Sequence, residues 1–428
     1  MLFGHEDWVT SLTWITSLSN ETSQLELNLV STSMDRSVLV WGECFEEEES
    51  FDDGKKRGIW DCVSKMGEVG GTLGGPLGAH VLGFLNGACS IDGLSLLITA
   101  YSGSFHLWRR ETIERDEEWK IEPFLSGHFG EVTDLEWMIY PKKQLRSEDS
   151  SNLKIDDQLF QIEDFIPTLF SVSKDQTCRV IGGKNLENLN SSIWSEISRP
   201  SIHGHDLNTI SLISPTSCVI GGEEKVLRVL DMTESSFHTM EEALQESLKL
   251  SQQSNEEFMF STPLAYMPEL NLSTRALEQK TQDEVEREEY NLELKGTVFD
   301  PREDQEVEEE LEENSPNLPK VEKVQTGITE KTIVKNSLWC ERKKLYQHYN
   351  EIVTCQISNS KKVLVSSCKS RDEENAKICF WDATSTNWDL MGIGGGHSST
   401  VIKFAFSPID DRFLVSVGRD RKVIVFDC

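Results

Sequence analysis

The chain has 428 residues, of which 37% are hydrophobic, and its 73 acidic and 42 basic side chains give a formal net charge of −31. This acidity argues against nonspecific nucleic-acid binding by the whole surface, and no run of about 18 apolar residues is present to span a membrane. The ten cysteines show neither C-x-x-C pairs nor zinc spacing. We therefore expect buried thiols, no metal, and a protein of the cytoplasm, with the nucleus as a second compartment.

A short sequence motif recurs along the chain. A Gly-His pair precedes an apolar alternation, and an Asp follows six residues before a large apolar side chain. The three close copies are His5, Asp35 and Trp41; His128, Asp175 and Ile181; and His397, Asp420 and Phe426. Alternation with a period of two predicts strands with one buried face. The repeat resembles WD40 repeats, the four-stranded blades of β-propellers, so we predict an all-β protein.

Residues 1–231 contain about four such units, which we interpret as the latter part of a first propeller. The second unit carries Ser102 where the Asp would stand, and the fourth, which begins at His203 or His205, carries Glu224. Residues 232–335 differ, with 25 acidic and 10 basic side chains and a weak helical period at Met240 and Leu244. Charge runs are usually solvated, so we predict a largely irregular acidic linker or insertion there.

Residues 336–428 contain about two further units, which we interpret as the start of a second propeller. The first of them begins at His348 and the second at His397. Propellers close with roughly four to eight blades. Four plus two blades are too few for two closed rings, so both propellers are predicted to be incomplete and the chain to be a fragment or a truncated gene product.

The repeated histidines could in principle act as general acids or bases, but a simpler role fits their spacing. Each pairs in sequence with the Asp of its own blade, and a buried Asp needs such partners because an unpaired buried charge is costly. The glycine-rich stretch 67–75 lacks a phosphate-loop pattern, and no nucleophile elbow or H-E-x-x-H occurs. We predict no enzymatic activity, no catalytic residue and no cofactor.

Two stretches carry a more specific resemblance than a generic blade requires. Residues 194–207 read W-S-E-I-S-R-P-S-I-H-G-H-D-L, and residues 336–352 read N-S-L-W-C-E-R-K-K-L-Y-Q-H-Y-N-E-I. They resemble phrases of the Elongator complex protein 2 family of WD40 proteins. The matching side chains are Trp194, Arg199, Pro200, His203, Asp206, Leu338, Trp339 and His348.

The resemblance implies two seven-bladed propellers packed together in a non-catalytic scaffold subunit of Elongator. Such a subunit joins the large scaffold subunit to the radical-SAM/acetyltransferase subunit and supports modification of wobble uridines in tRNA, with tRNA contacted indirectly at most. The alternative is a WD40 substrate receptor or peptide-reading adaptor, such as a ubiquitin-ligase subunit. Readers of that kind gather basic or aromatic residues at one propeller mouth, and the sequence shows no stripe of that kind.

Overall fold

The computed structural model describes residues 2–18, 25–45, 58–67, 83–90, 93–112, 118–122, 124, 127–141, 165–184, 193–244, 262, 264–266, 277–278, 330–408 and 410–428. These residues form a propeller of six antiparallel blades. Most of the glycine-rich stretch 67–75 and of the acidic region lies outside the described residues.

The first three blades each contain four consecutive strands. Blade one is β1 (Val9–Leu18), β2 (Leu25–Ser33), β3 (Ser37–Phe45) and β4 (Gly58–Gly67). Blade two is β5 (Phe84–Cys89), β6 (Ser95–Ala100), β7 (Phe105–Arg109) and β8 (Lys120–Glu122). Blade three is β9 (Val132–Pro141), β10 (Phe165–Ser173), β11 (Thr177–Lys184) and β12 (Ile193–Ile202).

The last three blades complete the series. Blade four is β13 (Leu207–Ser214), β14 (Ser217–Gly222), β15 (Val226–Asp231) and β18 (Cys340–Tyr346). Blade five is β19 (Ile352–Ile357), β20 (Val363–Cys368), β21 (Ile378–Asp382) and β22 (Leu390–Gly394). Blade six has three strands in the described part of the chain, namely β23 (Val401–Phe406), β24 (Phe413–Gly418) and β25 (Val423–Asp427).

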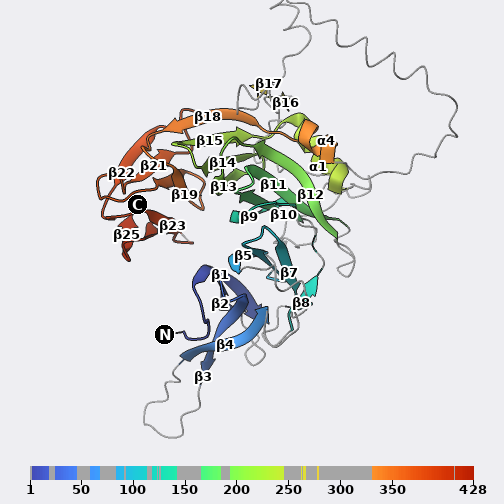
Figure 1. Ribbon diagram of the computed structural model, residues 1–428, viewed down its shortest axis with the longest axis vertical. Helices are drawn as coiled ribbons and strands as arrows, with labels where there is room; N and C mark the ends of the chain where they lie inside the picture. The colour runs from blue at the N-terminus through green and yellow to red at the C-terminus, as the bar shows by residue number, and fades with distance from the viewer. Residues whose placement is uncertain are drawn as a thin grey trace, which may run out of the picture.

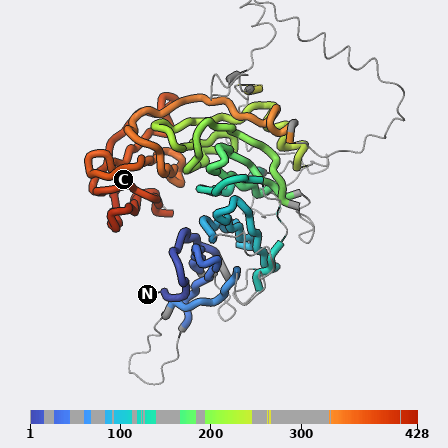
Figure 2. The backbone as a smooth tube through the Cα atoms, viewed as in Figure 1, coloured from blue at the N-terminus to red at the C-terminus, as the bar shows by residue number. Residues whose placement is uncertain are grey.

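The six blades follow one another around a central axis. The first strand of each blade contacts the first strand of the next, from β1 through β5, β9, β13 and β19 to β23. Figures 1 and 2 show the result as an arc that stays open between the first blade, in blue, and the last, in red. The blades therefore lie in one series, whereas the sequence suggested that the last two begin a second propeller.

Apolar clusters between adjacent blades hold this arc together. Blades one and two share a core that includes Val30 and Leu96, and blades four and five share one that includes Val219 and Ile352. Similar clusters lie between blades two and three, three and four, and five and six. The second strands of blades two to five are buried on both faces, as in β6, all six residues of which are buried. Burial of apolar surface between neighbouring blades stabilises the fold.

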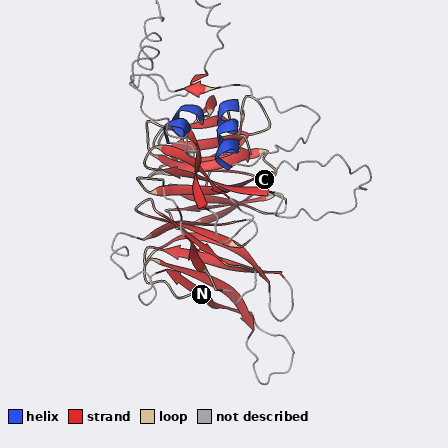
Figure 3. Ribbon diagram, turned by 90° about the vertical axis from the view of Figure 1, so that its right-hand side faces the viewer, coloured by secondary structure: helices blue, strands red, loops and turns tan. Residues whose placement is uncertain are grey.

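The acidic region is inserted inside blade four. β15 pairs with β18, with Leu227 opposite Leu345, so the predicted domain boundary at residue 336 falls just before the outer strand of this blade. Helices α1 (Glu234–Leu244) and α4 (Glu330–Asn336) stand at the two ends of the insertion and contact each other and β12. Figure 3 shows them beside the stacked sheets.

The insertion contains a helix that the sequence indicates. α1 buries Met240 and Leu244, the helical period that the sequence shows. A short sheet of β16 (Ala265–Tyr266) and β17 (Leu277–Glu278) lies between the helices in sequence.

Candidate functional site at the mouth of the propeller channel

In blade one, the predicted His–Asp pair forms a hydrogen-bonded network. His5 Nδ1 lies 3.0 Å from the Asp35 carboxylate, and His5 Nε2 lies 2.7 Å from the Ser31 hydroxyl. The Trp41 indole N–H donates to the same hydroxyl at 2.8 Å. Burial would raise the pKa of Asp35, but hydrogen bonds from the hydroxyl of Ser37 and from backbone N–H groups outweigh it and lower the pKa to about 2. The network ties the turn after β2 to β3 and to the chain before β1.

The copies in blades three and six bring the same pair together without a tryptophan. His128 lies 2.9 Å from the carboxylate of Asp175, and His397 lies 3.1 Å from that of Asp420. The second ring nitrogens of these histidines contact serine hydroxyls on β10 and β24. At the tryptophan position Ile181 and Phe426 have no polar hydrogen, so they add only apolar packing.

Blades four and five use variants of the network. His203 Nε2 lies 2.9 Å from the carboxylate of Glu224, which also accepts hydrogen bonds from the guanidinium of Arg228. His348 Nε2 lies 2.7 Å from the Ser366 hydroxyl, to which the Trp381 indole donates at 2.9 Å. Burial lowers the pKa of His348 to about 4, so its ring is neutral near pH 7. Each histidine thus stabilises its own blade.

In every blade, a turn follows the second strand, and in most blades this turn carries the Asp or Glu of the repeat. The residue just before that position occupies the same place in all six blades. Its backbone N–H donates to a carbonyl at the start of the first strand of that blade, over 2.8 to 3.0 Å. We call these six positions the rim residues. They are Met34, Tyr101, Lys174, Glu223, Lys369 and Arg419, and their acceptors belong to Trp8, Gly83, Glu131, Asp206, Glu351 and Thr400. The repeat therefore places six chemically different side chains around one end of the propeller.

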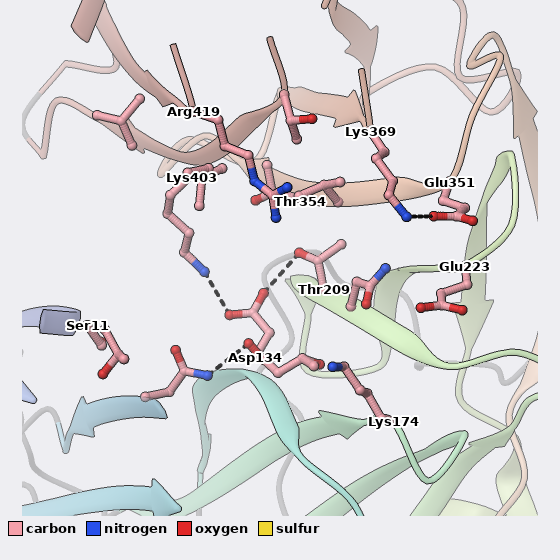
Figure 4. Close-up of a pocket in the computed structure, with 18 of the residues that line it drawn as sticks. Ser11, Asp134, Lys174, Thr209, Glu223, Glu351, Thr354, Lys369, Lys403 and Arg419 are labelled. Atoms are coloured by element: carbon pink, nitrogen blue, oxygen red, sulfur yellow. Dashed lines mark hydrogen bonds and ion pairs between the residues drawn. The ribbon is translucent and has the colours of Figure 1, made fainter. Parts of the chain in front are cut away.

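Four of the six rim residues line a cavity of about 900 Å³ at the axis of the arc. Its walls come from the first strands of all six blades, and Lys174, Glu223, Lys369 and Arg419 stand at its mouth (Figure 4). Deeper in the cavity, Asp134 accepts hydrogen bonds from the hydroxyl of Thr209 at 2.9 Å and from the ammonium group of Lys403 at 2.8 Å. The cavity is thus polar and mixed in charge.

Some charges at the mouth are paired and others are not. Lys369 lies 2.7 Å from Glu351, and Lys174 forms an ion pair with Glu131. Among the described residues, neither Arg419 nor Glu223 forms an ion pair within 4.0 Å. The buried hydroxyl of Thr354, which lines the same cavity, has no hydrogen-bond partner there either. Arg419 and Glu223 are exposed, whereas a buried polar group such as the Thr354 hydroxyl is nearly always bonded. The unbonded Thr354 hydroxyl, beside two exposed charges, makes the mouth a candidate binding site.

The basic residues of this mouth were not recognised from the sequence. Lys174, Lys369 and Arg419 are spread over three blades, and no local window of the sequence contains two of them. They converge because the blades are arranged around a common axis. A usable signal did exist: each basic residue closes the second strand of its repeat, directly before the turn.

The two stretches that carry the specific resemblance meet at the outer wall of blades three and four. The Trp339 backbone N–H donates to the carbonyl of Pro200 at 2.9 Å, and the Arg199 N–H donates to the hydroxyl of Ser337 at 2.7 Å. The guanidinium of Arg199 also bonds Glu196, and Glu330 of α4. We call this contact the seam. It fixes the end of the insertion to β12.

Further matching residues support this wall or a blade turn. Trp339 is fully buried and its indole N–H donates to the Ser236 hydroxyl of α1 at 3.0 Å, while the carbonyl of Leu338 accepts from the hydroxyl of Thr233. Trp194 is buried against Trp137, and the carbonyl of Asp206 accepts from the N–H of Glu223. In the parts of the chain that the structure describes, no cluster of three metal-ligating side chains occurs, and no helix is long and apolar enough to cross a membrane.

One family model matches the two ends of the chain. The WD40 family, described as WD domain, G-beta repeat, matches residues 1–42 and 388–427. A solved structure, Chaetomium thermophilum Sqt1 bound to the N-terminus of the ribosomal protein L10, has a TM-score of 0.45 and 12% identity, covering 100% of this chain and 86% of that one.

Curated relatives match almost the whole sequence. Elongator complex protein 2 of Homo sapiens is 31% identical over 424 residues, which are 98% of this chain and 44% of that protein. The Rattus norvegicus protein is 30% identical over 426 residues, with the same coverage, and the Arabidopsis thaliana protein 30% over 447 residues, covering 100% and 45%. The chain thus spans less than half the length of these relatives. It is thus similar, over nearly its whole length, to Elongator complex protein 2.

Proposed function

We propose that this chain serves as a non-catalytic scaffold of the Elongator complex. In this role it holds the large scaffold subunit and the radical-SAM/acetyltransferase subunit and so supports modification of tRNA wobble uridines. It acts in the cytoplasm, with the nucleus as a second compartment, and contacts tRNA indirectly at most. The observation that carries the proposal is the similarity over 98% of the chain to proteins named Elongator complex protein 2.

The arrangement of the polar side chains supports a scaffold rather than an enzyme. The His–Asp and His–Glu pairs of the repeats each lie within one blade, such as His128 with Asp175 in blade three. General acid–base catalysis instead needs such groups to converge on a substrate. The seam supports the same view, because the matching stretches stabilise the outer wall.

Affinity purification from the native cell tests the proposal. The tagged chain should recover the other Elongator subunits, and its loss should lower the content of modified wobble uridines measured by mass spectrometry of tRNA nucleosides. The same purification is carried out with the seam variant Arg199→Ala. The control variant is Arg371→Ala, whose side chain is exposed. Recovery of no Elongator subunit, together with normal wobble modification after the loss, contradicts the proposal.

We also infer that one further blade closes the arc. The face of blade one turned away from blade two exposes Leu12 by 63% and Trp14 by 56%. The corresponding face of blade six exposes Val423 by 67% and Val425 by 60%, and β25 has no further strand beside it among the described residues. Apolar faces and open strand edges favour association with another strand or sheet. The second propeller that the resemblance implies would then lie outside this arc.

Hydroxyl-radical footprinting tests the closing blade. Trp14 should be labelled in the isolated chain and protected in the Elongator complex isolated from cells, since the additional blade covers it. Phe129, which is 87% exposed in a blade turn, is the reference for labelling efficiency. Equal labelling of Trp14 in both samples would contradict a closing blade.

The alternative function, a WD40 substrate receptor or peptide-reading adaptor such as a ubiquitin-ligase subunit, is favoured by one observation. The rim gathers the basic side chains of Lys174, Lys369 and Arg419 at one mouth, as such readers do. If the purification recovers a ubiquitin ligase in place of Elongator subunits, the result supports this alternative function.

A further inference from the structure

The first strands of neighbouring blades are joined by side chains that reach from one strand to the next. We call β1, β5, β9, β13, β19 and β23 the inner strands and number the residues of each from its first residue. The hydroxyl of Thr133, at position two of blade three, donates to the carbonyl of Leu207, the first residue of the next inner strand, at 2.8 Å. The side chains that donate to the next first residue at the other joints up to blade five are Thr10, Asn86 and Asn208. Four successive joints therefore share this bond.

A second kind of bond joins the same strands. The hydroxyl of Thr209, at position three of blade four, accepts from the N–H of Cys355 in blade five at 3.1 Å. The hydroxyl of Ser211, at position five, accepts from the N–H of Ile357 at 2.9 Å. The acceptors at positions three and five of blade three, which bond to blade four, are Asp134 and Glu136. In each case the donor is one position further along its own strand than the acceptor.

Neither kind of bond joins the inner strands of blades five and six within the described residues. Position two of blade five is Val353, whose side chain has no polar hydrogen to donate. At positions three and five, the hydroxyl of Thr354 and the side-chain oxygen of Gln356 are buried and have no hydrogen-bond partner in this part of the chain. The donors that the pattern of the other joints predicts are the N–H groups of Phe404 and Phe406. The unbonded hydroxyl at the mouth is thus one of two unused acceptors on one strand.

Blades five and six are attached at their two ends instead. At the mouth, the N–H and the hydroxyl of Thr400 both donate to the carbonyl of Ser370, and the hydroxyl of Ser367 donates to the first carbonyl of β23 at 3.2 Å. At the opposite end, the carboxylate of Asp411 accepts from the N–H of Asn359 at 2.9 Å. An apolar cluster lies between the two blades. Two attached ends beside an unbonded inner strand define a line about which blade six can turn.

The remaining contacts of blade six allow a small turn. Apolar packing is not directional, so the cluster between the blades accommodates it. The ion pair of Lys403 with Asp134 crosses the axis through a long, flexible side chain, as Figure 4 shows. Blade six borders the gap in the arc in Figures 1 and 2, so its turning changes the width of that gap.

We propose that the joint between blades five and six is a hinge of the propeller. In the arc the hinge is unlocked, and in its locked position the N–H groups of Phe404 and Phe406 donate to Thr354 and Gln356. Buried polar groups are nearly always bonded, so locking satisfies two groups that the arc leaves unbonded. The locked position belongs to the closed ring. This part of the proposal rests on the closing blade proposed above, whereas the hinge itself does not.

Thermal unfolding of the purified 428-residue chain tests whether the joint is unlocked. Thr209→Val removes a hydroxyl that bonds Asp134 and Cys355, and it should lower the midpoint of unfolding by roughly 2 °C or more. Thr354→Val is the same change at the same position of the next blade. It should keep or raise the midpoint, because no internal hydrogen bond is lost. A fall in Thr354→Val as large as that in Thr209→Val overturns the proposal.

Hydrogen exchange measured by mass spectrometry tests the motion. In the isolated chain, β23 should exchange faster than β19. Val353→Thr supplies the hydroxyl that Thr133 supplies in blade three, and it should slow exchange in β23 roughly fivefold, as expected for one added hydrogen bond. The matched control is Ile402→Thr, at the same position of blade six, where the side chain is 47% exposed. The hinge is overturned if Val353→Thr leaves the exchange of β23 unchanged or if the control slows it equally.

The assembled complex separates the hinge from the closing blade. In the Elongator complex isolated from cells, β23 should exchange as slowly as β19, and Thr354→Val should restore faster exchange in β23 while Trp14 stays protected. If Trp14 is protected but β23 exchanges as fast as in the isolated chain, the locked position is wrong and the closing blade stands. If Trp14 is unprotected, the closing blade and the locked position are both wrong, and the variants of the isolated chain still decide the hinge.

Discussion

The ammonium group of Lys403 lies 2.8 Å from Oδ1 of Asp134, so an ion pair joins β23 of blade six to β9 of blade three. The two residues are 269 positions apart and reach each other across the axis. The Asp134 side chain is nearly buried, whereas that of Lys403 is 56% exposed to the cavity. This ion pair links the last blade directly to the middle of the arc.

Replacing Lys403 by methionine should therefore destabilise the chain. The change leaves the nearly buried carboxylate of Asp134 without its cationic partner, and we expect a loss of roughly 1–3 kcal/mol in the free energy of unfolding. Chemical denaturation measures it. The control is Lys422→Met, which removes a cation outside the cavity. An equal loss of stability in this control would contradict a specific role of the Lys403–Asp134 ion pair.

The blade networks give a second prediction. Asp175→Ala removes the partner of the buried His128 and two hydrogen bonds to Thr177, so we expect a loss of about 2–4 kcal/mol. Thermal unfolding should show it, while Glu6→Ala, an exposed residue before β1, should change stability little. If Asp175→Ala unfolds at the temperature of the unmodified chain, the structural role of the pair is wrong.

Stability should fall in acid for the same reason. The pKa values of Asp35 and Glu224 are lowered to about 2 in the fold, from 3.8 and 4.5. A carboxyl group with a lowered folded pKa contributes stability above its unfolded pKa and loses it as pH falls toward the folded value. Denaturation midpoints should thus decrease from about pH 4.5 to about pH 2, and less steeply in Asp35→Asn. An equal slope in that variant would exclude Asp35 as a source.

Glu136 should have the opposite pH dependence. Burial raises its pKa to about 7, although the positive charges of Lys361 and Lys403 and a hydrogen bond from the N–H of Leu212 oppose this rise. A carboxyl group with a raised pKa loses stability as pH rises through the folded value. Glu136→Gln should therefore gain stability relative to the unmodified chain between about pH 5 and about pH 8. If the difference in stability between Glu136→Gln and the unmodified chain does not change with pH, the ionisation of Glu136 is not its source.

The local parts of the fold follow from the sequence, and the assembled parts do not. His5 and Asp35 could be paired in advance because both belong to one blade and the spacing recurs. The return of β18 to β15 could not, because a long insertion separates the paired strands. Loop closure costs little more as a loop lengthens, so such a pairing is compatible with folding. The approach of Lys369 and Arg419 likewise depends on the angle between blades, which no single repeat encodes.

The seam and the two helices have a consequence for how this protein tolerates change. α1 and α4 contact each other on β12, so the chain leaves blade four and re-enters it at neighbouring points. β16 contacts α4 and β17 contacts β18, so the stretch 279–329 begins and ends beside one fixed position. Its length and composition can vary without altering blade order, which makes it the natural place to add a reporter domain while the propeller stays intact.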